Sequence, residues 1–225
     1  MITVHHLEHS RSHRVLWLLE ELELLYEVER YARDPKTMLA PPELKAVHPL
    51  GKSPVVTDGE LTLAESAAIL EYLLERYGNG RLMPPSGSAE HLRFRYWMHY
   101  AEGSAMPPLL LKLVFDRIAE GPLPFFVRPV ARAIAKGAQS AFIGPQLKTH
   151  LDHMEAALEQ TKWFAGDAFS AADIQMSFPL EAAQARAGLD ASRPRLMDFL
   201  QRIRQRPAYK RATERGGPAQ PQRQG

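Results

Sequence analysis

Five polar side chains suited to chemistry lie side by side near the start of the chain, within the stretch LEHSRSHRVLWLLEEL (residues 7–22). They are two hydroxyls, two guanidinium groups and one imidazole: Ser10, Arg11, Ser12, His13 and Arg14. A helical pattern follows them directly. Such a group can cap that helix, bind an anion, or hold a reactive atom of a substrate. The residue types alone leave all three uses open.

The chain of 225 residues contains no cysteine. Its composition therefore excludes disulfides, thiolate-ligated zinc and any mechanism in which the protein's own thiol is the nucleophile. Nine histidines remain, but none forms an H-E-x-x-H pattern. The neighbours His5 and His6 would point to opposite faces of a strand and could not easily share a metal. We expect no metal site.

The overall composition, 45% hydrophobic and 24% charged, is typical of a soluble globular protein. No apolar run approaches the roughly 18 residues of a membrane span. The N-terminus MITVHHLEHS lacks the basic start and apolar stretch of a secretory signal. We therefore expect a cytoplasmic protein with no membrane partner. The basic run over 202–223 lacks interleaved aromatics and is more typical of a solvated surface than of a nucleic-acid site.

Strand and helix patterns alternate along the first 80 residues. The expected elements are a strand at 2–7, a helix from Ser12, a strand at 25–32, a short helix within 40–49, strands at 54–57 and 61–63 around an Asp58-Gly59 turn, and a helix from Ser66 that stops at Gly78. In the first helix, apolar residues mark the buried side, while Glu20, Glu21 and Glu23 should face outward. The order βαβαββα predicts an α/β domain with helices on its sheet.

Beyond residue 80 no strand pattern is present. Residues 81–88 suit an interdomain linker because they are rich in glycine, proline and serine. Residues 89–213 suit an all-helical domain, and 214–225 a disordered tail with nothing apolar to bury. The expected helices are 88–118, interrupted near Pro107-Pro108, then 125–141, 145–161, 171–186 and 194–206. Charge also divides the chain, since residues 1–80 hold 8 Lys and Arg against 13 Asp and Glu, and the rest hold 20 against 13.

Three motifs, in this order, resemble the glutathione transferase family. HPLGKSPVV (48–56) and LAESAAILEYL (63–73) resemble its glutathione-binding half, and FSAADIQMSF (169–178) resembles its capping box and staple motif. The opening SRSHRVLWLLEEL (10–22) is similar to bacterial, serine-type, theta-like members. The resemblance covers about residues 2–211. It implies a thioredoxin-like N-terminal domain followed by an all-α domain, and glutathione as co-substrate.

The resemblance also implies which residues hold glutathione. Glu65 would accept from the γ-glutamyl amine, while Ser66, which also suits a helix N-cap, would donate to the adjacent carboxylate. Ser53 would offer its backbone to the cysteinyl part, next to a cis bond at Pro54. Lys52 would pair with the glycine carboxylate, although a solvated surface lysine remains an alternative.

In the thioredoxin-like fold a Cys-x-x-Cys would fall where this chain has Ser10, Arg11, Ser12 and His13. A hydroxyl at the first position can donate to the glutathione thiolate and lower a thiol pKa that is ordinarily about 8.5. Ser10 is therefore the expected catalytic residue. Ser12 is the runner-up and is better interpreted as the helix N-cap. The arginines could add positive field, or Arg14 could form a salt bridge to the second domain; His13 is expected at the surface without a role.

The second substrate is expected to be a small hydrophobic electrophile bound between the domains. Tyr96, Tyr100 and Met106, with Leu109 and Leu113, are the candidates for its pocket, although such stripes are more often core. Asp173 follows Ser170 at capping-box spacing and should be structural.

The sequence thus predicts a glutathione S-transferase, a homodimeric detoxification enzyme by its resemblance. One alternative is a glutathione-dependent peroxidase or disulfide reductase that uses the same site. The other is a non-catalytic, transferase-like binding module, which is disfavoured because Ser10, Lys52, Glu65 and Ser66 are all present.

Overall fold

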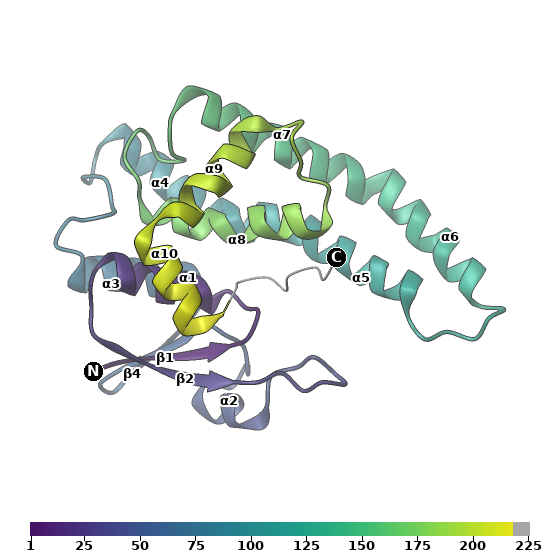
Figure 1. Ribbon diagram of the computed structural model, residues 1–225, viewed down its shortest axis with the longest axis horizontal. Helices are drawn as coiled ribbons and strands as arrows, with labels where there is room; N and C mark the ends of the chain where they lie inside the picture. The colour runs from purple at the N-terminus through teal and green to yellow at the C-terminus, as the bar shows by residue number, and fades with distance from the viewer. Residues whose placement is uncertain (218–225) are drawn as a thin grey trace.

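The computed structural model describes residues 1–217 and shows a small sheet domain beneath a larger set of helices (Figure 1). The predicted order βαβαββα is confirmed, with strand limits within one residue of expectation. The elements are β1 (Ile2–Leu7), α1 (Ser12–Glu21), β2 (Tyr26–Tyr31), α2 (Pro42–Val47), β3 (Val55–Asp58), β4 (Leu61–Ala64) and α3 (Ser66–Tyr77).

The sheet has the strand order β2-β1-β3-β4. β1 lies parallel to β2, which requires the crossover helix α1 between them, and antiparallel to β3. Because β1 and β3 run in opposite directions, the end of β1 lies beside the start of β3, with His5 opposite Val55. This topology brings the turn that carries Ser10 next to the loop that carries Ser53.

The rest of the described chain is helical, as predicted. Its elements are α4 (Ala89–Tyr100), the π-helical turn η1 (Ala101–Ala105), α5 (Met106–Glu120), α6 (Arg128–Ala138), the π-helical turn η2 (Gln139–Ile143), α7 (Gly144–Gln160), α8 (Ala171–Arg186), α9 (Pro194–Gln205) and α10 (Pro207–Gly216). The interruption expected at Pro107-Pro108 takes the form of η1, and the two prolines lie in the first turn of α5, where a missing N–H is tolerated.

Helix α8 runs through the centre of the helical domain and is buried from Ala171 to Ala183. It begins with the predicted capping box: Asp173 accepts from the backbone N–H of Ser170 at 2.8 Å and from that of Phe164 at 2.9 Å. Asp173 is fully buried, and burial raises its pKa to about 7. The structural role expected for Asp173 is confirmed.

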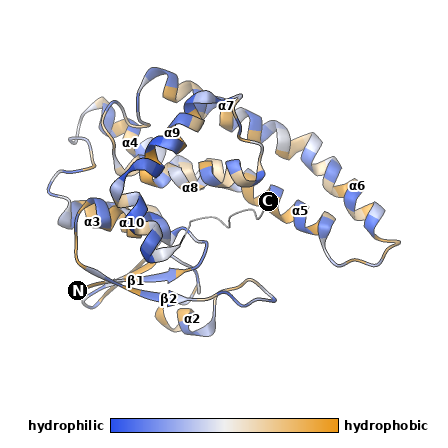
Figure 2. Ribbon diagram, viewed as in Figure 1, coloured by the Kyte–Doolittle hydropathy of each residue, from blue (hydrophilic) through white to orange (hydrophobic). Residues whose placement is uncertain are grey.

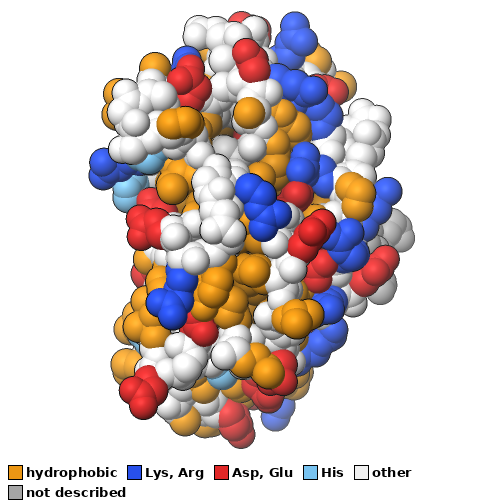
Figure 3. Space-filling view, turned by 90° about the vertical axis from the view of Figure 1, so that its left-hand side faces the viewer, with side chains coloured by type: hydrophobic (Ala, Val, Ile, Leu, Met, Phe, Trp, Pro, Cys, Tyr) orange, Lys and Arg blue, Asp and Glu red, His pale blue; other side chains and the backbone are white. Residues whose placement is uncertain are grey.

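The C-terminal helix α10 packs back against α1. Glu20 and Glu21, predicted to face solvent, are instead covered by this packing, and that prediction is wrong. Arg211 Nε lies 2.6 Å from Glu20, and Arg206 Nε lies 2.6 Å from Glu21. Arg206 and Arg211, both part of the basic run, therefore form ion pairs that hold the C-terminal helix against the sheet domain. In Figure 3, Lys and Arg side chains gather along one edge of the face, with acidic side chains among them.

The end of α10 changes the expected tail. The helix continues to Gly216, so the first three residues assigned to that tail are helical. Residues 218–225 lie outside the described part of the chain. Within residues 1–217, no helix combines the length and apolarity needed to span a bilayer.

Candidate active site

A cavity of about 310 Å³ opens where the sheet domain meets η1 and α5. It brings together all five predicted glutathione-binding residues. Its lining residues are Arg11, His48, Leu50, Lys52, Ser53, Pro54, Ala64, Glu65, Ser66, Glu102 and Leu110. The sequence interpretation did not include Glu102, Leu110, His48 or Leu50 among them.

The loop before β3 forms one wall of this cavity. Its Ser53-Pro54 peptide bond is cis, as the resemblance implies. The Ser53 hydroxyl donates to the His5 carbonyl at 2.9 Å and accepts from the Leu7 N–H at 3.2 Å. The side chain of Ser53 thus fixes the loop to β1.

The start of α3 forms a second wall. Ser66 is the first helical residue, so the N-cap interpretation of Ser66 is wrong; Glu65 occupies that position with φ +73°, a left-handed value uncommon outside glycine. Ser66 Oγ accepts from Arg14 Nη1 at 3.2 Å and from Gln175 Nε2 at 3.3 Å. With both lone pairs used, the Ser66 O–H is left to donate into the cavity.

A cross-domain ion cluster supports this wall. Arg14, only 1% exposed, lies 2.5 Å from Glu102 of η1, and Arg11 lies 2.9 Å from the same carboxylate. Burial alone would raise the pKa of Glu102, but the two arginine charges outweigh it and hold the pKa below its ordinary value. Of the alternatives left open for Arg14, the salt bridge to the second domain is the one observed. Nothing in the helical pattern around Glu102 marks it as a site residue.

Ser10 lies behind the loop rather than on the cavity lining. Its Oγ is 3.3 Å from Ser53 Oγ and 2.7 Å from Ser12 Oγ, and it accepts from the Ser12 N–H at 3.2 Å. The prediction that Ser12 is the N-cap is wrong: α1 begins at Ser12, and the Ser12 hydroxyl bonds to His6 Nδ1 at 2.9 Å. Strand alternation directs His6 toward α1, where its buried imidazole forms a hydrogen bond with the Ser12 hydroxyl.

His13 is buried, not on the surface as predicted. Its Nε2 lies 3.0 Å from the Thr213 hydroxyl of α10, and burial lowers its pKa to about 4. The imidazole is therefore neutral near pH 7. His13 is buried because α10 packs back onto α1, and no local sequence pattern around His13 predicts that contact.

The candidates for the second-substrate pocket do not line this cavity. Tyr96 is half exposed, Tyr100 donates to or accepts from His150 Nδ1 at 2.6 Å in a mostly buried position, and Met106 is buried. Leu109 is also core, whereas its neighbour Leu110 reaches the cavity. The π-helical turn η1 explains this shift of one residue, because an inserted residue rotates the following helix face by about 100°.

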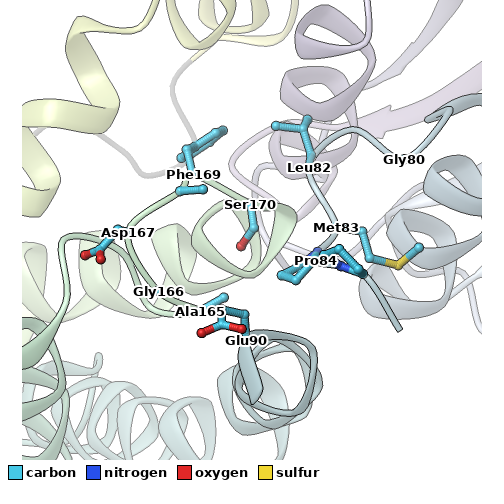
Figure 4. Close-up of a pocket in the computed structure, with 12 residues that line it drawn as sticks. Gly80, Leu82, Met83, Pro84, Glu90, Ala165, Gly166, Asp167, Phe169 and Ser170 are labelled. Atoms are coloured by element: carbon cyan, nitrogen blue, oxygen red, sulfur yellow. The ribbon is translucent and has the colours of Figure 1, made fainter. Parts of the chain in front are cut away.

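A second cavity, of about 300 Å³, lies between the linker and the loop before α8 (Figure 4). Leu82, Met83 and Phe169 supply much of its apolar wall, and Glu90 and Asp167 are the charged side chains among the described residues of its lining. Among the described residues that line it, none is Lys or Arg, so it does not match a tripeptide with two carboxylates. Across residues 1–217 no group of three or more His, Asp or Glu side chains is placed to hold a metal ion.

The cis-proline loop beside β1 and α1, followed by an all-helical domain, defines a thioredoxin-like two-domain protein. Residues 1–75 match the model of the glutathione S-transferase N-terminal domain, and residues 123–207 match that of the C-terminal domain. Glutathione S-transferase 3 of Schizosaccharomyces pombe is 37% identical over 215 residues, which is 96% of this chain and 88% of that protein. Glutathione S-transferase 1 of Saccharomyces cerevisiae is 32% identical over 96% of this chain and 95% of its own length.

Solved structures agree with these relatives. The crystal structure of a glutathione S-transferase from Actinobacillus pleuropneumoniae superposes with a TM-score of 0.78 at 34% identity, covering 96% of this chain and 93% of that one. The chain belongs to the glutathione S-transferase family and is a glutathione transferase. The predicted fold and activity are confirmed.

Proposed function

We propose that this transferase binds glutathione in the cavity between the cis-proline loop and α3, and that Ser10 stabilises its thiolate for attack on a small hydrophobic electrophile. One observation carries the proposal: Lys52, Ser53, Glu65 and Ser66 line a single cavity, and Ser10 contacts Ser53 directly. A sphingomonad glutathione S-transferase complexed with glutathione has the same fold, with a TM-score of 0.72.

The charges of the cavity match those of the tripeptide. The free Ser66 O–H and the first N–H groups of α3 suit the γ-glutamyl carboxylate, because a helix N-terminus favours an anion. Glu65 suits the adjacent amine, and Lys52 suits the glycine carboxylate at the open side. Ser53 offers its backbone to the cysteinyl part between them.

The thiol then lies near the turn between β1 and α1. A hydroxyl that donates to the sulfur stabilises the thiolate, and each unit by which the thiol pKa falls corresponds to about 1.4 kcal/mol. The protein contributes no thiol of its own. A mixed disulfide between protein and substrate is therefore impossible, which favours conjugation over disulfide reduction by such an intermediate.

The electrophile would enter from the helical domain. Leu50 and Leu110, both more than half exposed, are the large apolar side chains among the described residues that line the cavity. We place the second substrate against these two residues. The residues predicted for its pocket, Tyr96, Tyr100 and Met106, do not line this cavity.

We also propose that the enzyme is a cytoplasmic homodimer. Apolar residues recur along α5 and α6, which extend as a hairpin away from the rest of the protein (Figures 1 and 2). Exposed apolar side chains on this hairpin are Leu111, Val114, Ile118, Val130 and Ile134. Exposed apolar groups in such numbers are typical of an association surface. Sedimentation velocity at micromolar concentration should show a dimer, and a monomer would contradict this assignment.

The test of Ser10 measures binding and turnover separately. Wild-type protein should be retained on immobilised glutathione and conjugate a chloronitrobenzene. Ser10→Ala should retain most glutathione binding and lose most conjugation. Conjugation at the wild-type rate in Ser10→Ala would refute the assignment. Cumene hydroperoxide, assayed alongside, distinguishes a peroxidase that uses the same thiolate.

A further inference from the structure

A chain of short hydrogen bonds runs from Ser10 to the end of the last helix. Ser10 Oγ is 2.7 Å from Ser12 Oγ, Ser12 Oγ is 2.9 Å from His6 Nδ1, and His6 Nε2 is 2.7 Å from the Gly216 carbonyl. All three side chains are buried. The glutathione site as described above uses only the first member of this chain.

The Gly216 carbonyl decides which ring nitrogen of His6 carries the proton. A carbonyl only accepts, so at 2.7 Å it requires a proton on Nε2. In the neutral imidazole Nδ1 is then bare and can only accept, and Ser12 Oγ at 2.9 Å is its donor. The other acceptor within reach of Ser12, the Leu7 carbonyl, is more distant at 3.5 Å.

The direction of the whole chain follows from that tautomer. Because the Ser12 proton lies on the bond to His6, Ser12 Oγ at 2.7 Å can only accept from Ser10. Ser53 Oγ, whose own proton goes to the His5 carbonyl, is the more distant acceptor for the same Ser10 proton, at 3.3 Å. In the free protein the Ser10 proton thus points inward, away from the place of the glutathione sulfur. Rotation of the Ser10 hydroxyl alone would also direct its proton to a thiolate, but Ser10 Oγ and Ser12 Oγ would then face each other at 2.7 Å with no proton between them. Reversal of every bond in the chain keeps that contact satisfied, and it needs one additional proton on His6 Nδ1.

Glutathione itself can supply that proton. We propose that His6 takes up the proton of the glutathione thiol through Ser10 and Ser12, so that formation of the thiolate and reversal of the chain are a single event. This proposal rests on the function proposed for Ser10.

The proton count balances in three transfers. The S–H bond breaks as the proton joins Ser10 Oγ, the former Ser10 proton moves to Ser12 Oγ, and the former Ser12 proton moves to His6 Nδ1. The products are a thiolate and an imidazolium. His6 then donates to Ser12, Ser12 donates to Ser10, and Ser10 donates to the sulfur. No oxidant, metal or added base takes part.

The surroundings of His6 favour a neutral ring before glutathione binds. Burial lowers its pKa, the bond to Gly216 raises it, Arg30 of β2 lowers it, Glu8 raises it and His9 lowers it. His13 of α1, itself neutral near pH 7, is a further titratable neighbour. His6 Nδ1 therefore carries no proton before glutathione binds. Once the thiolate has formed at the other end of the chain, its negative charge stabilises the imidazolium.

The residue whose carbonyl accepts from His6 Nε2 is a glycine, Gly216, and the close packing around it requires one. A Cβ added to Gly216 would lie 2.4 Å from Leu16 Cδ1 and 2.9 Å from His6 Cε1. Only glycine lets the last turn of α10 approach the imidazole this closely. His6 is thus a positioning residue that acts on the substrate through two serines, with its tautomer set by the C-terminal helix.

Nitrogen-15 NMR of the full-length enzyme tests the proposal directly. The His6 ring, assigned by comparison with His6→Gln, should be neutral with its proton on Nε2 in the free protein and become an imidazolium when glutathione is added. S-methylglutathione is the matched control, because it fits the same site but has no thiol proton. With it, His6 should stay neutral. A ring that stays neutral with glutathione, or charges equally with both ligands, would overturn the proposal.

Variants give a second readout, the pKa of the bound thiol from its ultraviolet thiolate absorbance. Ser12→Ala and His6→Gln should raise that pKa by about one unit and shift the acidic limb of the kcat/KM profile with it, a tenfold loss below the pKa. His5→Gln, the neighbour on the opposite face, should change neither. If the thiol pKa is unshifted in Ser12→Ala but raised in Ser10→Ala, His6 is excluded as the proton acceptor, and the role proposed for Ser10 still holds. No shift in Ser10→Ala would instead refute the function proposed for Ser10.

Discussion

Replacing Glu102 with glutamine removes the charge that compensates the buried Arg14 but preserves the shape of the side chain. Arg14 is 1% exposed and its Nη1 lies 2.5 Å from Glu102 Oε1. Removing one partner of a buried ion pair costs about 3–5 kcal/mol, since the other charge stays buried. Glu102 is 29% exposed and glutamine still accepts a hydrogen bond, so we expect the low end, about 3 kcal/mol, at pH 7.

The pH dependence of this loss distinguishes the lost charge from altered packing. The pKa of Glu102 in the folded protein lies below its unfolded value, because the charges of Arg14 and Arg11 outweigh the effect of burial. A carboxyl with a lowered pKa stabilises the fold above its unfolded pKa, and that contribution disappears as the pH falls through the folded value. The difference in the free energy of unfolding between wild type and Glu102→Gln should therefore have its full size at pH 7 and shrink below about pH 4.

Urea unfolding at a fixed protein concentration, followed by the fluorescence of the three buried tryptophans, measures both quantities. Glu90→Gln is the control, because Glu90 forms an exposed pair with Arg93 and should change stability by no more than about 0.5 kcal/mol. A loss below about 1 kcal/mol at pH 7, or a difference that persists undiminished in acid, would refute the role given to the cluster.

Three further changes test other parts of the structure. Asp173→Ala should cost about 2–4 kcal/mol, because two buried N–H groups lose their acceptor. Since burial raises the pKa of Asp173 to about 7, its contribution is greatest in acid and lost as the pH rises through 7, so the loss measured by urea unfolding should be larger at pH 5 than at pH 8. Gly216→Ala should destabilise by about 1–3 kcal/mol through crowding, whereas Gly137→Ala, with open space around its Cβ, should be neutral or stabilising in thermal melts. Lys52→Met should raise the KM for glutathione about fivefold with little change in kcat, as expected for an exposed ion pair of about 1 kcal/mol; an unchanged KM would exclude Lys52 from the site.

The sheet domain could be predicted almost completely from the sequence. Period-two and period-3.6 patterns place each element, and the Asp58-Gly59 turn marks the hairpin. The cavity wall formed by residues 52–54 and 65–66 could also be predicted, because both segments lie in contiguous motifs. Local patterns were sufficient wherever the residues that act together are neighbours in the chain.

The errors concern partners that lie far apart in the chain. His13 and Glu20 are buried because α10 returns to α1 some 190–200 positions later, as their bonds to Thr213 and Arg211 show. The apolar pattern alone does not predict which face of α5 meets the cavity, because η1 inserts a residue into an otherwise regular helix. A serine directly before a helical pattern predicts a cap, whereas the hydroxyl of Ser12 bonds to His6 on the preceding strand, a buried partner that the pattern does not reveal.

The Ser66 hydroxyl receives one hydrogen bond from each domain, from Arg14 and from Gln175, while Glu102 of the helical domain compensates Arg14. Exchange of domains between related transferases would therefore transfer more than a surface for the second substrate. A chimera whose helical half lacked the equivalents of Gln175 and Glu102 would carry an uncompensated cation behind its glutathione site. The two halves of this enzyme are separate in architecture but must vary together at these positions.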